Sequence, residues 1–108
     1  MQKREIRRGR PTGSKRFEEE PAKAFGMAVK VLRTERGTAQ EALANLAGVE
    51  RAHMGRIERG EHMPTLAVIL NVAGALECSA AFLMEETEKC LKLVRAGALV
   101  DEDHDNRV

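Results

Sequence analysis

Apolar residues in the middle of the chain recur every three or four positions, which is the repeat of an amphipathic α-helix. Phe25, Val29 and Leu32 form one such stripe. A second stripe runs from Leu66 to Leu76. No segment between these stripes alternates strictly between apolar and polar residues, as a half-buried β-strand does. The pattern predicts an all-α fold, a compact bundle of about five helices.

Glycines, prolines and cap residues divide this pattern into helical segments. The expected boundaries are Pro21, Gly37, Gly48, Gly60, Pro64, Ser79 and Gly97. Between them, residues 40–47 and 51–59 are two short segments separated by a glycine turn of about four residues. Two short helices joined in this way are typical of a helix-turn-helix motif.

Charge is distributed unevenly along a chain of 108 residues whose net charge is only +1. Seven Lys and Arg residues against Glu5 give residues 1–16 a net charge of +6. We expect residues 1–20 to be a disordered basic arm, residues 21–97 the folded domain, and residues 98–108 an acidic tail. The basic arm favours a polyanionic partner, although a merely solubilising tail fits the charge equally well.

Composition limits the chemistry that this chain can perform. The absence of Trp and Tyr argues against a base-stacking platform for single-stranded nucleic acid. The sequence contains no nucleophile–base pair, metal-ligand spacing or phosphate loop, so we expect no enzyme activity, no metal and no cofactor. Cys78 and Cys90 form no disulfide framework, and we interpret Cys78 as a packed core thiol, with redox sensing as the alternative. No apolar run approaches the roughly 18 residues of a membrane span, so we expect a cytoplasmic, nucleoid-associated protein.

The most specific signal lies in residues 40–60, which read QEALANLAGVERAHMGRIERG. Gln40 opens the first short segment, Gly48 occupies the turn, and Gly60 closes the second segment. This stretch resembles the phage repressor/Cro-type helix-turn-helix of the XRE family of bacterial regulators, and the resemblance extends over about residues 25–84. It implies a lambda-repressor-like domain that binds double-stranded DNA sequence-specifically and regulates transcription, with a repressor as the expected role. The alternative is a protein-interaction module, such as a toxin-neutralising antitoxin that also binds its own promoter.

The third helical segment has an inward and an outward face. Met54 and Ile57 face inward on its helical repeat, which leaves Arg51, Ala52 and Arg56 outside. Arginine commonly reads guanine O6 and N7 in the major groove, and a methyl group such as that of alanine packs on the thymine methyl. The resemblance places Arg51, Ala52 and Arg56 at base-reading positions.

The resemblance also implies contacts around these positions. Residues at or near the DNA backbone would be Thr38, Gln40, His53 and Arg59, with an inert His53 as the alternative. It further implies an ion pair between Arg33 and Glu58 that fixes how the recognition helix is presented. If buried, breaking one side of this pair would cost about 3–5 kcal/mol, whereas an exposed pair would be worth less than about 1 kcal/mol.

Several residues depart from the family pattern. Ala39 replaces the usual Ser or Thr cap, so Thr38 is expected to cap one residue early. Glu50 replaces the usual Ser, where it could interact with the helix dipole, place a negative charge near phosphates, or accept a hydrogen bond from cytosine N4. Glu77 stands where the family prefers glycine. Gly55 within a helix indicates a close approach, either to DNA or to the preceding helix; the alternative is that its cost is simply tolerated.

Two further segments extend the interpretation beyond the motif. The stretch from Arg8 to Pro11 resembles an AT-hook core, which reads the A·T-rich minor groove; a general phosphate-binding arm and an uninvolved tail are the alternatives. The arm residues concerned are Arg7, Arg8, Arg10, Lys15 and Arg16.

An apolar strip near the end of the folded segment is expected to mediate a homodimer, although it could also pack back onto its own chain. The strip consists of Leu83, Cys90, Leu91 and Val94. The expected partners are therefore double-stranded DNA, a second copy of the chain and possible further proteins, without a membrane.

Overall fold

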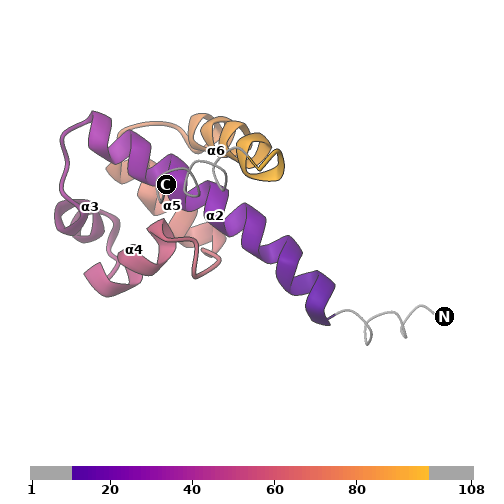
Figure 1. Ribbon diagram of the computed structural model, residues 1–108. Coiled ribbons are helices and arrows are strands. Elements are labelled where there is room, and N and C mark those ends of the chain that lie inside the picture. Colours follow the sequence, from indigo (N-terminus) through magenta and orange to yellow (C-terminus); the bar gives the residue numbers. More distant parts are fainter. Residues whose placement is uncertain (1–10, 98–108) are drawn as a thin grey trace, which may run out of the picture.

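The computed structural model describes residues 11–97 of the chain. Within this range it contains five α-helices and no strand, which confirms the all-α prediction (Figure 1). The helices are α2 (Pro11–Glu35), α3 (Gln40–Ala47), α4 (Arg51–Glu58), α5 (Leu66–Ala75) and α6 (Ala80–Arg95).

The first helix begins at Pro11 and not near Pro21, which corrects the expected start of the folded part. Residues 11–20 are therefore helical and not part of a disordered arm, while residues 1–10 lie outside the described residues. Pro21 sits inside the helix, where a proline removes one backbone hydrogen bond. Five of the six residues 15–20 are Lys, Arg or Glu, which have high helix propensity, as expected of a helical segment.

Local cap chemistry explains where the later helices begin. Thr65 Oγ1 accepts a hydrogen bond from the Val68 amide at 3.1 Å, and Ser79 Oγ accepts one from the Phe82 amide at 2.9 Å. The cap predicted at Ser79 is confirmed. The residue before α3 is Ala39, whose side chain makes no cap hydrogen bond, so the cap predicted at Thr38 is wrong.

One residue in the described range adopts a left-handed conformation without being glycine. Glu77, just after α5, has a φ of 61°. The family prefers glycine at this position. The conformation explains the preference, because only glycine adopts it without a steric penalty.

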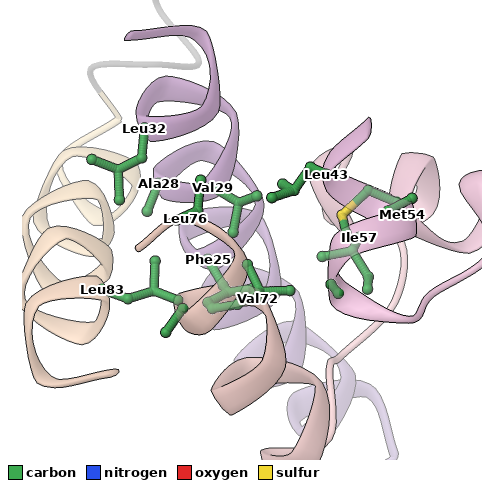
Figure 2. Close-up of a cluster of buried hydrophobic side chains, with 13 residues drawn as sticks. Phe25, Ala28, Val29, Leu32, Leu43, Met54, Ile57, Val72, Leu76 and Leu83 are labelled. Carbon is green, nitrogen blue, oxygen red and sulfur yellow. The ribbon is translucent and has the colours of Figure 1, made fainter. Parts of the chain in front are cut away.

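The core forms where side chains of all five helices meet. In Figure 1, α2 crosses the molecule, with α6 on one side and α3 and α4 on the other. Side chains from all five helices converge on one cluster, shown in Figure 2. Its largest fully buried members are Val29, Leu43, Met54, Ile57, Val72, Leu76 and Leu83. Each such burial contributes roughly 1.5–3 kcal/mol, so the cluster fixes the relative positions of the helices.

Two of the four residues in the strip expected to mediate a dimer pack in the core of their own chain. Leu83 is fully buried among residues of its own chain, and Cys90 packs against the same cluster. Leu91 and Val94 are half-buried. This burial follows from the packing of α6 along α2.

Both cysteines are free thiols and half-buried. Cys78 packs against the core cluster, as expected for a structural thiol. Burial raises the pKa of the Cys90 thiol, with a smaller contribution from Glu86. The reactive thiolate form of Cys90 is therefore disfavoured.

No single helix in residues 11–97 is long and apolar enough to span a membrane, and α5 and α6 reach the required length only together, across a 104° bend.

Candidate nucleic-acid interface

The turn between α3 and α4 holds these two short helices at a fixed angle. Gly48 ends α3 in a left-handed conformation with φ 73°, and the Val49 amide donates to the Ala44 carbonyl at 2.9 Å. Ala44 and Ala47 are buried, and their small side chains let α3 pack closely against its neighbours. Residues 40–58 thus form the predicted helix-turn-helix.

One face of α4 packs in the core, and the opposite face is exposed and could contact DNA. Met54 and Ile57 are fully buried in the core. Arg51, Ala52 and Arg56 are exposed on the other side of the helix. The three residues predicted to read bases therefore share an accessible surface. Within residues 19–97, no hydrogen bond or ion pair involves the Arg51 side chain, so its guanidinium is available to a ligand.

His53 holds the second arginine of this surface. Its Nδ1 lies 3.3 Å from Nη2 of Arg56. Because a guanidinium only donates hydrogen bonds, Nδ1 must be the acceptor, which places the ring proton on Nε2. The rings of His53 and His62 meet edge to face with centroids 4.5 Å apart. Desolvation lowers the pKa of His53, and the charges of His62 and Arg56 lower it further, so the neutral ring is favoured.

A buried carboxylate fixes α4 from behind. Glu58 Oε2 accepts from Arg33 Nε at 2.7 Å, and Glu58 Oε1 accepts from Arg33 Nη2 at 2.9 Å. The exposed fractions of the two side chains are 3% for Glu58 and 14% for Arg33. The structure therefore has the buried ion pair and not the exposed one. The hydrogen bond to Glu58 raises the pKa of Arg33. The ion pair joins α4 to α2.

Gln40 and Thr38 both contact the ion pair between Arg33 and Glu58. Gln40 Nε2 donates to Glu58 Oε1 at 2.9 Å. The Thr38 carbonyl accepts from Arg33 Nη1 at 3.0 Å. The first turn of α3 is thereby held against α2 and α4, and Gln40 is positioned at the start of the helix-turn-helix.

Gly55 marks a close approach between side chains at the centre of the motif. A Cβ at this position would lie 3.2 Å from Arg59 Nη1 and 3.6 Å from Gln40 Oε1. The tight neighbour is therefore Arg59, with α3 just beyond it. Arg59 itself pairs with Glu61 through Nε at 3.0 Å and Nη2 at 3.1 Å, and this contact lowers the pKa of the Glu61 carboxyl.

Two neighbours of the site were not predicted from the sequence. Glu61 pairs with Arg59, and His62 packs on His53. Both lie in the connection that follows α4, and only the turn at Gly60 brings them back to the helix. Among the described residues, no three His, Cys, Asp or Glu side chains cluster as metal ligands would.

Arg7, Arg8 and Arg10 lie outside the described residues. Lys15 and Arg16 belong to the first turns of α2, with side chains outside the described set.

A short helix that is anchored from behind and bears two exposed arginines on its outer face defines a helix-turn-helix DNA-binding protein. Comparison with known proteins agrees. Residues 24–83 match the family described as helix-turn-helix domain. The chain belongs to this family, as a regulator of the XRE type.

Two curated relatives are transcriptional regulators. The chain is 34% identical over 59 residues to the uncharacterized HTH-type transcriptional regulator YazB of Bacillus subtilis, covering 55% of this chain and 86% of YazB. It is 38% identical over 55 residues to the HTH-type transcriptional regulator SutR of Escherichia coli, covering 51% of this chain but only 31% of SutR.

Solved structures show the same fold. The restriction-modification controller protein C.AhdI from Aeromonas hydrophila matches with a TM-score of 0.56 at 39% identity, covering 57% of this chain and 94% of that one. The clp gene regulator ClgR from Corynebacterium glutamicum matches with a TM-score of 0.68 at 23% identity, covering 76% and 87%, which is a likeness of fold alone. The predicted family and its DNA-binding, transcription-regulating role are confirmed.

Proposed function

We propose that the protein acts as a homodimer on a near-palindromic operator, with α4 of each copy in the major groove. The observation that carries this proposal is the outward placement of Arg51, Ala52 and Arg56 on a helix whose opposite face is fixed by Glu58. Two such helices would occupy successive grooves about 34 Å apart. Bound in this way next to a promoter, the dimer would repress by obstructing polymerase, in the cytoplasm where the nucleoid lies.

Base recognition falls to the outer face of α4. Arg51 and Arg56 carry the paired donors that match guanine O6 and N7, and the Ala52 methyl suits a thymine methyl. His53 assists by orienting Arg56 through the 3.3 Å contact.

Contacts with the DNA backbone would supply affinity and register. Gln40 uses one amide hydrogen for Glu58 and keeps the other for a phosphate. Arg59 keeps Nη1 available beyond its two bonds to Glu61. The Thr38 hydroxyl and the basic arm of residues 1–16 add further donors.

The dimer contact needs exposed apolar residues, and α3 and α5 carry three of them. Leu46, Leu66 and Leu70 are 67%, 70% and 52% exposed. Leu46 and Leu70 line one surface hollow, and Leu66 lies one turn before Leu70 on α5. This α3–α5 surface is mainly apolar, because α5 has no charged residue and Glu77 is the one charged residue that lines the hollow, and such a surface can face its own copy across a twofold axis.

Sedimentation equilibrium tests this α3–α5 surface. Leu70→Glu should weaken the dimer by about 30-fold or more, because it places charges opposite each other across the twofold axis. Leu93→Glu on α6, where the leucine is 46% exposed, is the matched control and should leave the dimer intact. Equal dimer constants for the two variants would remove the α3–α5 surface from the interface.

Selection of bound duplexes from a random pool tests the DNA-binding proposal. The wild type should recover two inverted half-sites, and Arg51→Ala or Arg56→Ala should each relax the preference at one base pair per half-site by about 1–3 kcal/mol. Recovery of unrelated sequences, together with co-purification of a small partner protein, would instead favour the antitoxin-like alternative.

A further inference from the structure

Glu50 lies at the edge of the predicted DNA-reading surface and has no structural partner there. It is the N-cap residue of α4, with φ −66° and ψ 145°, and it directly precedes Arg51. Its side chain makes no cap hydrogen bond to the first turn of α4. It forms no ion pair with any residue in the range 19–97, and it is exposed. Nothing in the described fold uses this carboxylate.

Glu50 lies about one helical turn before His53, at the start of α4. The negative charge of Glu50 is the one influence that raises the pKa of His53, against the desolvation and the positive charges that lower it. His53 in turn contacts Arg56. Glu50 and Arg51 stand at the start of the recognition helix, and Arg56 lies in its last turn.

A carboxylate at this place is unfavourable unless it meets a hydrogen-bond donor. The DNA phosphates repel it, so an acidic group at the interface lowers the affinity of the protein for DNA. Ionised carboxylates only accept hydrogen bonds. In the major groove, guanine presents acceptors at O6 and N7 and thymine an acceptor at O4, so neither suits Glu50. The exocyclic amines of cytosine and adenine are the remaining partners.

Cytosine fits better than adenine for a geometric reason. Adenine presents the N7 acceptor beside its N6 amine, so the second carboxylate oxygen would face a lone pair. Cytosine presents only the N4 amine at this edge. The neighbouring Arg51 is suited to guanine, and a C·G pair offers the donor and the two acceptors that Glu50 and Arg51 together require.

We propose that Glu50 is a specificity-determining residue that selects cytosine at one position in each half-site, in or beside the base pair read by Arg51. The inference rests on the proposed DNA-binding function. It assigns an order to the recognition surface: an acceptor at the start of α4, then a donor pair at Arg51, then a second donor pair at Arg56.

Binding titrations with the full chain test this assignment on the operator recovered by selection. The wild type should prefer cytosine at the Glu50 position by about fivefold or more, which corresponds to the lower end of base discrimination by one side chain. Replacing that cytosine by N4-methylcytosine should weaken wild-type binding, because the methyl group obstructs the amine.

Two variants separate the charge from the hydrogen bond. Glu50→Ser should lose the cytosine preference and the sensitivity to N4-methylcytosine, while the positions read by Arg51 and Arg56 stay unchanged; serine also caps α4 well, so the fold should persist. Glu50→Gln should shift the preference towards adenine, since glutamine pairs with N6 and N7. Glu88→Gln on α6 removes the same charge at an exposed position and should retain the wild-type preference.

The outcomes separate a failure of the Glu50 proposal from a failure of the proposed operator binding. If both Glu50 variants keep the wild-type base preference at every position while Arg51→Ala alters it, Glu50 reads no base and this inference is wrong. If the wild type itself shows no base preference, the proposed operator binding fails instead.

Discussion

At the scale of single residues, Glu58 is the side chain of the motif that links the helices to one another. It lies on α4, accepts two hydrogen bonds from Arg33 of α2, and accepts a third from Gln40 of α3. One carboxylate therefore joins the three helices that together hold the recognition surface.

Neutralising that carboxylate should be costly. Glu58→Gln keeps the size of the side chain but leaves the guanidinium of Arg33, which is 14% exposed, without its counter-charge. We expect a loss of about 3 kcal/mol in the free energy of unfolding, measured by urea denaturation. Glu61→Gln, which breaks an exposed pair with Arg59, is the control and should leave the urea midpoint unchanged. A wild-type midpoint for Glu58→Gln would contradict the structural role of the pair.

The lowered pKa of His53 gives stability a pH dependence of known sign. Its pKa in the folded state lies below the ordinary value, so the unfolded chain binds the proton more tightly. The contribution of His53 is thus fully present above the ordinary histidine pKa of about 6.5, and it is lost as the pH falls through the lower folded-state value. Protonation also removes the acceptor that Nδ1 offers to Arg56.

We therefore expect the wild type to lose stability between pH 7 and pH 5 more steeply than His53→Gln, which has no titrating ring. Urea denaturation at a series of pH values measures the difference. Parallel curves for the two proteins would show that His53 does not titrate differently in the folded and unfolded states.

At the scale of elements, the helix-turn-helix depends on a close contact between two backbones. A Cβ added at Gly26 of α2 would overlap the carbonyl oxygen of Ile57 and come within 2.7 Å of that of Glu58, both at the end of α4. Because backbone atoms cannot rotate out of the way, α2 and α4 would have to separate. Gly26 is thus required by packing.

Gly26→Ala should destabilise the protein by about 1–3 kcal/mol and weaken DNA binding, because α4 is displaced. The matched control is Gly74→Ala in α5, where a Cβ would meet nothing within 4 Å. There the higher helix propensity of alanine should leave stability equal or improve it by up to about 1 kcal/mol. Thermal unfolding compares the two, and equal shifts for both variants would contradict the close contact.

The same scale shows what the sequence can predict and what it cannot. The starts of α5 and α6 follow from Thr65 and Ser79, whose caps are local. The start of α2 does not, because Pro21 is compatible with both the first turn and the interior of a helix. The direction of the apolar stripe on α6 is likewise ambiguous until its packing along α2 is known.

Among site residues, the exposed trio on α4 followed from helical periodicity, and the ion pair between Arg33 and Glu58 followed from the family resemblance. The contacts of Glu61 and His62 could not be predicted, because they depend on how the chain turns back after Gly60.

At the scale of the whole molecule, the unequal distribution of charge should govern how binding responds to salt. Residues 1–16 have a net charge of +6, and the whole chain has a net charge of +1. If the arm contacts phosphates, its arginines release counterions on binding.

Replacing Arg7, Arg8 and Arg10 together by Gln should therefore reduce the slope of log K against log salt by up to about 0.9 for each phosphate that the arm no longer neutralises. This triple variant is preferable to deleting residues 1–16, which would remove the start of α2. Titrations between 50 and 200 mM salt, roughly the range in which such slopes are measured, provide the test. An unchanged slope would place the arm outside the interface.

The separation between the inner and outer sides of α4 has a consequence for how such a protein diversifies. Met54, Ile57 and Glu58 secure the helix, whereas residues 51, 52 and 56 take no part in its attachment to the core. A library randomised at those three outer positions should keep its melting behaviour while its members acquire new target sequences. The same fold could then acquire specificity for a changed promoter sequence through a few substitutions on the outer face of α4.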